Sequence, residues 1–236
     1  MVEVNMADRA KTPLNVGLMV PINNTTMERE LPAWLPVGST CTTLRIPRGK
    51  SLLTPEAMPA YKAQALALAA TFADFDIDIV VYGCTAAGFI AGPAAEAELA
   101  AQLSEVTGKL VVTTAISMVL TLQDTQAKDI VLITPYSDHI NKQLMVFLTE
   151  GDIRVKRLDS FRVADVEELG RIRPDAVADL ARATMGRDCD ALFIACSQLP
   201  TYDILDSLQT EFGRPAWSSI KATAWQIRRV LNMQIA

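Results

Sequence analysis

Val80-Val81-Tyr82-Gly83-Cys84 is an apolar run that ends in a cysteine, and Leu192-Phe193-Ile194-Ala195-Cys196 repeats this pattern later in the chain. Short runs without a polar face are typical of strands that are buried on both sides of a parallel sheet. A small hydroxylated residue, Thr85 or Ser197, follows each cysteine. The two stretches therefore predict two equivalent strands, each with a thiol at its carboxyl end.

The two strands belong to a longer internal repeat. A further strand that ends in a proline, followed by a polar loop, precedes each of them. These polar loops hold Asn24 and Tyr136, and the spacing between Asn24 and Tyr136 equals the spacing between Cys84 and Cys196. Because several landmarks recur in the same order, we expect a duplicated fold of two similar halves.

Short apolar runs alternate with longer helical stretches, a pattern that predicts an α/β fold. We expect two pseudo-symmetric Rossmann-like lobes, each with a mainly parallel sheet flanked by helices, and an active site in the cleft between them. The predicted strands are Leu14–Val20, Cys41–Ile46, Ile77–Tyr82, Lys109–Thr113, Asp129–Thr134, Arg154–Leu158, Ala191–Ala195 and Pro215–Trp217. The predicted helices are Thr54–Phe75, Ala91–Thr107, Ala115–Gln126, Asp138–Glu150, Pro174–Met185, Tyr202–Phe212 and Ser219–Met233. Residues 14–116 with 218–236 are assigned to an N-terminal lobe, and residues 117–217 to a C-terminal lobe.

Composition narrows the class of protein. The chain has 236 residues, half of them hydrophobic, and a net charge of −5, which argues against a nucleic-acid partner. No apolar run approaches the roughly 20 residues that cross a bilayer, and Met1–Lys11 lacks the apolar core of a signal peptide. We therefore expect a cytoplasmic protein with a small-molecule partner and no membrane contact; a homo-oligomer is compatible with the apolar composition.

The remaining reactive side chains give little support to metal or hydrolase chemistry. Cys41 and Cys189 lie outside the repeat and are predicted to be small buried residues. All four cysteines are expected to be free thiols in a reducing compartment. A zinc site is not indicated, because the chain has a single histidine, His139, and no cluster of Cys and His. A serine hydrolase is not indicated either, because the sequence has no Gly-x-Ser-x-Gly nucleophile elbow. We expect neither a metal nor a cofactor.

Two opposed thiols permit chemistry at carbon, because one can attack or deprotonate an electrophilic carbon while the other supplies a proton. A helix start after each cysteine would favour the thiolate. Backbone amides and hydroxyls at these positions could bind a carboxylate, and the absence of Arg or Lys beside the motifs is compatible with this. The candidate catalytic residues are Cys84 and Cys196; the candidate substrate-binding residues are Asn24, Tyr136, Thr85, Ser197, Thr113, Thr114, Ser218 and Ser219.

The same residues carry a family resemblance. Pro21-Ile22-Asn23-Asn24-Thr25-Thr26-Met27-Glu28, the two cysteines and Pro135-Tyr136 resemble the aspartate/glutamate racemase superfamily, nearest to maleate cis–trans isomerases and, next, to arylmalonate decarboxylases. The resemblance implies that Cys84 attacks the double bond of maleate and forms a succinyl-type adduct. It also implies that Cys196 donates and accepts the proton, and that Asn24 and Tyr136 bind the carboxylates.

Two positions depart from these branches. Val166 stands where the isomerase pattern has a further substrate-binding asparagine, which weakens the case for maleate itself. Conversely, Cys84 stands where arylmalonate decarboxylases have glycine. The sequence therefore combines features of both branches.

Three alternatives to isomerisation remain open. Symmetric thiols also suit a two-base racemase of Asp, Glu or hydantoins. Decarboxylation of a disubstituted malonate would depend on Cys196 and tolerate glycine at position 84. A binding protein without catalytic activity is the third alternative. The segments Pro47–Thr54 and Phe161–Arg173 are expected to determine substrate specificity. In the first of them, Pro47–Lys50 forms either a basic lid over a dianion or a solvated loop.

Overall fold

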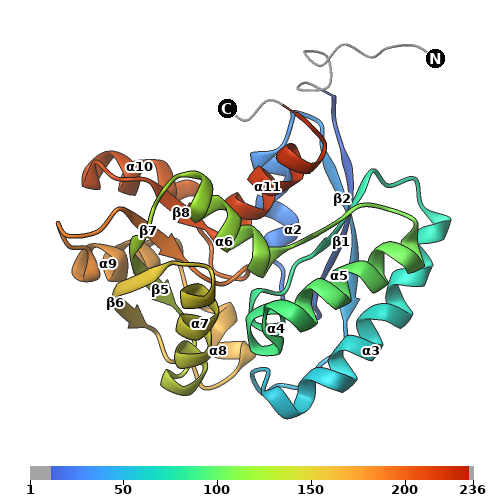
Figure 1. Ribbon diagram of the computed structural model, residues 1–236, viewed down its shortest axis with the longest axis horizontal. Helices are drawn as coiled ribbons and strands as arrows, with labels where there is room; N and C mark the ends of the chain where they lie inside the picture. Colours follow the sequence, from blue (N-terminus) through green and yellow to red (C-terminus); the bar gives the residue numbers. More distant parts are fainter. Residues whose placement is uncertain (1–11, 234–236) are drawn as a thin grey trace.

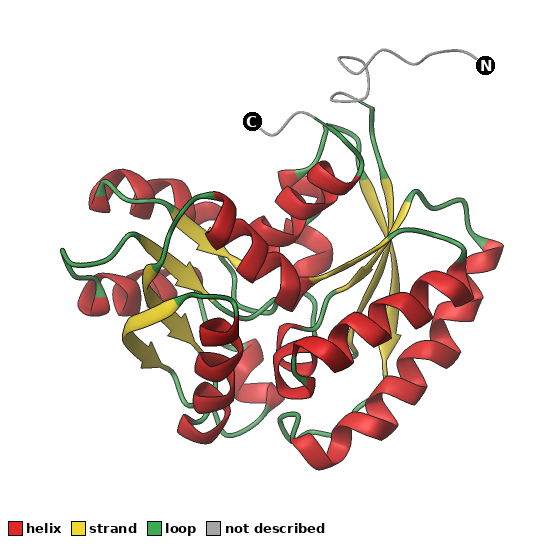
Figure 2. Cartoon of the chain, in the orientation of Figure 1, coloured by secondary structure: helices red, strands yellow, loops and turns green. Residues whose placement is uncertain are grey.

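The computed structural model describes residues 12–233 and places the strands of this part in two four-stranded sheets, one in each lobe (Figures 1 and 2). All strand pairs within the two sheets are parallel. The first sheet has the order β2 (Thr40–Ile46), β1 (Asn15–Pro21), β3 (Ile79–Tyr82) and β4 (Val111–Thr113). The second has the order β6 (Arg154–Ser160), β5 (Asp129–Thr134), β7 (Ala191–Ile194) and β8 (Ala216–Ser218). The two sheets repeat one strand order, which confirms the predicted duplicated α/β fold.

Helices cover the sheets, and all but the short α2 and α8 lie at or near predicted positions. They are α2 (Met27–Glu30), α3 (Met58–Ala69), α4 (Thr85–Ala91), α5 (Pro93–Thr107), α6 (Thr114–Asp124), α7 (Asp138–Glu150), α8 (Val166–Gly170), α9 (Pro174–Thr184), α10 (Tyr202–Phe212) and α11 (Ser219–Val230). Short 3₁₀ turns are η1 (Pro32–Trp34), η2 (Pro55–Ala57) and η3 (Ala70–Asp74). No helix within residues 12–233 is long and apolar enough to cross a membrane.

Two of the predicted helices differ from the structure for local reasons. The stretch expected as one helix from Thr54 to Phe75 consists of α3 between the 3₁₀ turns η2 and η3. The helix expected from Ala91 begins at Pro93, because Gly92 has φ of 84° and interrupts the helical backbone between α4 and α5. Proline fits the first turn of α5, where its missing N–H is not needed.

The central strands form the core of each lobe. All four residues of β3 and all four of β7 are buried, as expected for strands covered on both faces. The carboxyl ends of these strands point toward the boundary between the lobes, where the polar loops meet. The core therefore fixes both cysteine-bearing ends.

The lobes exchange one helix each. Met118 and Leu122 of α6, which follows the first sheet in the chain, belong to the apolar core around β5 and β7. Ile220 and Ile227 of α11, which follows the second sheet, belong to the core around β1 and β3. The two helices also contact each other near the middle of the molecule (Figure 1). Each sheet is therefore covered in part by a helix that the chain reaches from the other sheet.

Candidate active site

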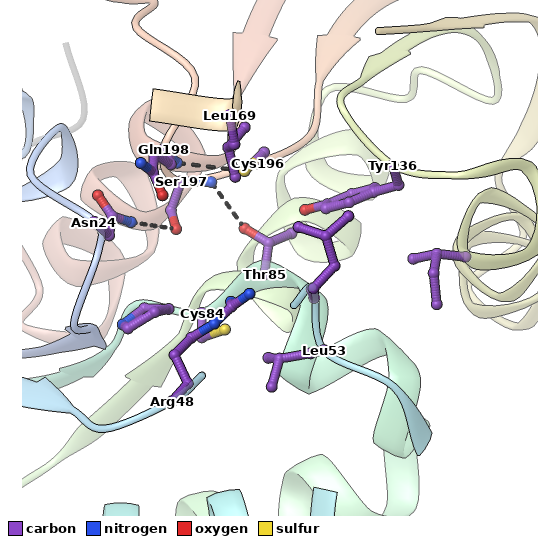
Figure 3. A pocket seen from close by; sticks show the side chains of 14 residues that line it. Asn24, Arg48, Leu53, Cys84, Thr85, Tyr136, Leu169, Cys196, Ser197 and Gln198 are labelled. Atoms are coloured by element: carbon purple, nitrogen blue, oxygen red, sulfur yellow. Dashed lines mark hydrogen bonds between the residues drawn. The ribbon is translucent and has the colours of Figure 1, made fainter. Parts of the chain in front are cut away.

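One cavity between the lobes receives both repeated cysteines (Figure 3). It lies at the carboxyl ends of the strands, where parallel α/β proteins bind ligands. The fourteen lining residues are Pro21, Asn24, Arg48, Leu52, Leu53, Cys84, Thr85, Ala86, Tyr136, Ile140, Leu169, Cys196, Ser197 and Gln198. The structure thus brings together six of the predicted site residues: Cys84, Cys196, Asn24, Tyr136, Thr85 and Ser197.

The position of Cys84 depends on a close approach of two strand ends. Cys84 is the N-cap residue of α4, directly after β3. A Cβ atom on Gly83 would lie 2.7 Å from the Met27 Sδ and 2.9 Å from a methyl carbon of Val20. Only glycine fits this gap without displacing its neighbours. Gly83 therefore lets the end of β3 pass close to β1 and hold the thiol at the cavity.

Cys196 has a different local structure from Cys84. A turn follows it, in which the Leu199 N–H donates to the Cys196 carbonyl at 3.2 Å, and α10 begins only at Tyr202. The predicted helix start directly after each cysteine is therefore right for Cys84 and wrong for Cys196. Pro200 explains the delay, because a residue before proline is disfavoured in the helical conformation. The N–H groups of Thr201 and Tyr202 donate to the Glu30 carboxylate of the other lobe.

Hydrogen bonds across the lobe boundary connect the predicted polar residues. The Asn24 Nδ2 donates to the Ser197 Oγ at 3.0 Å, and that hydroxyl donates to the Gly83 carbonyl at 2.7 Å. The Ser197 N–H donates to the Thr85 Oγ1 at 3.2 Å. The Asn24 Oδ1 accepts the N–H groups of Thr26 and Met27. Within residues 12–233, these bonds leave one Asn24 amide hydrogen and the Thr85 hydroxyl hydrogen available to a ligand.

Burial controls the protonation of the Cys84 thiol. Burial raises its pKa above the ordinary value, because an anion is costly in an apolar environment. The Ala87 N–H, the positive charge of Arg48 and the Tyr61 hydroxyl each lower that pKa, but by less than burial raises it. The expected thiolate stabilisation by a helix start is thus present but outweighed.

The Cys196 thiol has a raised pKa as well, again chiefly through burial. The Gln198 N–H, 3.4 Å from the Cys196 Sγ, and the Tyr136 hydroxyl lower it. Negative charge on Cys84 raises it further. Two adjacent thiolates repel each other equally, so the thiols differ through their other partners: the charge of Arg48 acts on Cys84, whereas uncharged groups of Gln198 and Tyr136 act on Cys196.

Tyr136 is buried between the thiol and an aromatic neighbour. Its hydroxyl faces Cys196 and has no other hydrogen-bond partner among residues 12–233. Its ring meets Phe89 edge to face at a centroid distance of 5.4 Å. The side chains of Asn141 and Ser160 donate to its carbonyl. Tyr136 is thus fixed with its O–H directed at the cavity.

Thr113, Thr114 and Ser218 are not among the residues that line the cavity, so their role in substrate binding stays a prediction from the sequence. The Thr114 hydroxyl donates to the Tyr82 carbonyl at 3.2 Å, and the Ser218 Oγ accepts the Lys221 N–H as the N-cap of α11. These residues lie outside the cavity because of the strands that they follow. The chain enters a helix directly after β4 and β8, and the cavity lies at the ends of their neighbours instead. Ser219, on the first turn of α11, is outside the cavity as well.

Arg48 and Gln198 line the cavity but were not among the predicted site residues. Arg48 belongs to the basic segment Pro47–Lys50, for which a lid over a dianion was one of two expectations, and the structure places its side chain at the cavity. Gln198 donates from Nε2 to the Asn23 carbonyl at 3.1 Å and accepts the Asn23 amide. The sequence feature that could have identified Gln198 is its position in the loop directly after Cys196. Val166 is not a lining residue; its N–H donates to the Lys50 carbonyl at 3.2 Å.

The other cysteines lie apart from the cavity. Cys189 is buried, as predicted, and its Sγ donates to the Gly186 carbonyl. Cys41 is only half-buried on β2, so the prediction of full burial is wrong for this residue. In the part of the chain that the structure describes, no three His, Cys, Asp or Glu side chains gather as metal ligands would.

Comparison with known proteins relates this geometry to characterised enzymes. A maleate isomerase from Nocardia farcinica is 29% identical over 231 residues, which cover 94% of this chain and 91% of the relative. A solved structure of a maleate cis–trans isomerase mutant from the same species, with a covalently bound succinylcysteine intermediate, superposes with a TM-score of 0.85 at 27% identity. That match covers 94% of each chain.

Two further matches agree with the fold and the sequence. A maleate isomerase from Pseudomonas putida, solved with maleate, has the same fold, with a TM-score of 0.87 at 22% identity over 94% of this chain and 93% of that chain. The sequence profile of the family described as arylmalonate decarboxylase matches residues 16–236. The chain therefore belongs to the arylmalonate decarboxylase family.

Proposed function

We propose that the protein is a cofactor-independent isomerase that converts maleate, or a closely related cis-enedioate, to the trans isomer. The observation that carries the proposal is the pair of buried thiols, Cys84 and Cys196, in one cavity with unequal electrostatic surroundings. The similarity to proteins named maleate isomerase supports the choice of substrate. A cytoplasmic location and a homo-oligomer stay predictions from the sequence.

At the start of the reaction, Cys84 is a thiolate and Cys196 is a protonated thiol. The Cys84 thiolate forms a bond to one olefinic carbon, and the electron pair of the double bond takes the proton of the Cys196 thiol at the neighbouring carbon. The product is a succinyl group on Cys84 and a thiolate at Cys196. After rotation about the new single bond, Cys196 removes a proton from that carbon, the double bond forms again and Cys84 leaves. Both thiols return to their initial states.

The roles follow from the different partners of the thiols. Arg48, Tyr61 and the first N–H groups of α4 favour negative charge at Cys84. At Cys196 the charge of Cys84 disfavours a second anion. This is the arrangement that a nucleophile and a general acid require.

Carboxylate binding is assigned to Asn24, Thr85 and Tyr136. Asn24 and Thr85 keep one free donor each, and Tyr136 directs its O–H at the cavity. Uncharged donors held by the fold can stabilise the enolate-like charge that develops on a carboxylate during addition.

The lining argues against amino acids as substrates. None of the fourteen lining residues is acidic, so an α-ammonium group would enter without a counter-charge. Racemisation of Asp or Glu is therefore the weaker proposal. Decarboxylation needs only one cysteine and leaves Cys84 without a role.

The direct test is incubation of the purified, reduced protein with maleate. We expect maleate absorbance in the ultraviolet to fall while the proton NMR signal of fumarate appears in equal amount. Release of CO₂ from an arylmalonate, or deuterium uptake by aspartate in heavy water, without any fumarate from maleate would replace isomerisation by one of the alternatives.

The pH profile should reflect the raised pKa of Cys84. Because the attacking form is the thiolate and burial raises the thiol pKa, kcat/KM should increase from neutral to alkaline pH. It should decrease where Cys196 also loses its proton. Tyr61→Phe removes a hydroxyl that lowers the Cys84 pKa, so the rising limb should move to higher pH. A rate that falls steadily above neutral pH would contradict the assignment.

A further inference from the structure

Arg48 is the only charged side chain among the fourteen residues that line the cavity (Figure 3). Its Nη2 donates to the Ser51 carbonyl at 2.7 Å, and its Nε is buried without a hydrogen-bond partner among the described residues. No carboxylate within residues 12–233 forms an ion pair with it, whereas Arg45 on the preceding strand pairs with Glu28 at 2.6 Å. A guanidinium has five donors, so most of the hydrogen-bonding capacity of Arg48 remains unused.

The segment that carries Arg48 is attached to the opposite lobe. Ser51 forms an antiparallel bridge with Asp165, and the Lys50 carbonyl accepts the Val166 N–H at 3.2 Å. Ser51 is also the residue whose carbonyl holds the guanidinium. Arg48 is thus positioned at the cavity by contacts from both lobes and does not depend on a free loop.

The position of the charge matches a second anionic group. Arg48 lines the same cavity as Cys84 (Figure 3), and its positive charge lowers the pKa of the Cys84 thiol. The donors at Asn24 and Thr85 are uncharged and suit one carboxylate. A second carboxylate in this apolar cavity needs a positive counter-charge, which Arg48 alone supplies. The planar guanidinium also matches a carboxylate through two parallel hydrogen bonds.

We infer that Arg48 binds the second carboxylate of the substrate and makes the site select dicarboxylates over monocarboxylates of the same size. Only the statement that the bound dicarboxylate is a substrate rests on the proposed function. The preference of the site for dicarboxylates over monocarboxylates does not depend on the reaction. Arg48 therefore acts in place of a polar side chain at position 166, where Val166 lies outside the cavity.

Calorimetric titration with succinate and with its monoamide, succinamate, tests the assignment without requiring turnover. The wild-type protein should bind succinate about 10- to 100-fold more tightly than succinamate, since a hydrogen-bonded charge pair contributes about that factor. Arg48→Met should reduce this ratio to near one, with most of the loss in succinate affinity. Lys50→Met is the matched control, because Lys50 is a cation of the same segment, is exposed and does not line the cavity. It should keep the wild-type ratio.

The outcomes separate this inference from the proposed function. If the wild-type protein forms no fumarate but shows the Arg48-dependent ratio, the proposed reaction is wrong and the role of Arg48 stands. An unchanged ratio in Arg48→Met, or equal binding of both ligands by the wild-type protein, overturns the role of Arg48 whatever the reaction. If Arg48→Met does not fold, Arg48→Lys replaces it. Loss of the planar guanidinium should still lower the ratio several-fold, and a ratio equal to that of the wild type would refute the assignment.

Discussion

Cys84→Ala should lower kcat/KM for maleate by about 10⁴-fold or more, a loss typical of removing a nucleophile. Without the Cys84 sulfur no covalent bond to the olefinic carbon can form, so the double bond stays intact and rotation about it stays blocked. The substitution removes one buried atom and leaves Gly83, Thr85 and the first turn of α4 in place. The measurement is fumarate formation by proton NMR, with circular dichroism to verify the fold.

Cys189→Ser is the matched control for this experiment. Cys189 is also a buried cysteine, but it lies before the start of β7, outside the cavity. Its replacement should leave kcat/KM within a few-fold of the wild-type value. If Cys84→Ala retained activity and Cys196→Ser did not, the covalent step at Cys84 would be wrong, and single-cysteine chemistry, as in decarboxylation, would explain the site better.

Cys196→Ser should accumulate a succinyl adduct on Cys84 when it is mixed with maleate. The nucleophile, Arg48 and the first turn of α4 are intact in this variant, so addition can still occur, more slowly, with water supplying the proton that Cys196 no longer donates. Elimination requires a base at position 196, and a serine hydroxyl, unlike a thiol, does not ionise to a base in the accessible pH range. Turnover should therefore fall by about 10²- to 10⁴-fold while the adduct persists.

Intact-protein mass spectrometry should show an increase by the mass of one maleic acid, and peptide mapping should locate it on Cys84. The double variant Cys84→Ala/Cys196→Ser is the control and should gain no mass. An adduct on position 41 or 189, or full activity of Cys196→Ser, would contradict the assigned roles. A relative has been solved with a covalently bound succinylcysteine intermediate, which makes the expected species chemically reasonable.

The fold was largely predictable because its signals are local and repeated. The apolar runs at β3 and β7 have no polar face, and their equal spacing to the polar loops gives the order of elements in both lobes. The short helices α2 and α8 were not predicted, because helices of 4 and 5 residues are too short to show a helical period. Gly92 and Pro93 mark the boundary between α4 and α5, as a glycine before a proline in a helical stretch indicates.

Only those site residues that directly follow a buried strand could be predicted from the sequence. Cys84, Cys196, Asn24 and Tyr136 meet in the cavity because the repeat places each of them just after a buried strand. Ser218 follows the same rule but serves as a helix cap, and nothing in the sequence distinguishes a capping hydroxyl from a ligand-binding one. The position of Arg48 depends on the contact of its segment with Val166, a long-range contact without a sequence pattern.

The exchange of α6 and α11 couples the folding of the two halves. A sheet formed by β1–β4 lacks the buried Ile220 and Ile227 until the end of the chain has been made and has passed through the second lobe. Likewise, the core around β5 and β7 takes Met118 and Leu122 from the segment that joins the halves. Neither half is a self-sufficient folding unit, although each has its own sheet. Unfolding of one half exposes apolar surface of the other, so the two halves gain and lose their structure together, and the opposed thiols exist only in the complete molecule.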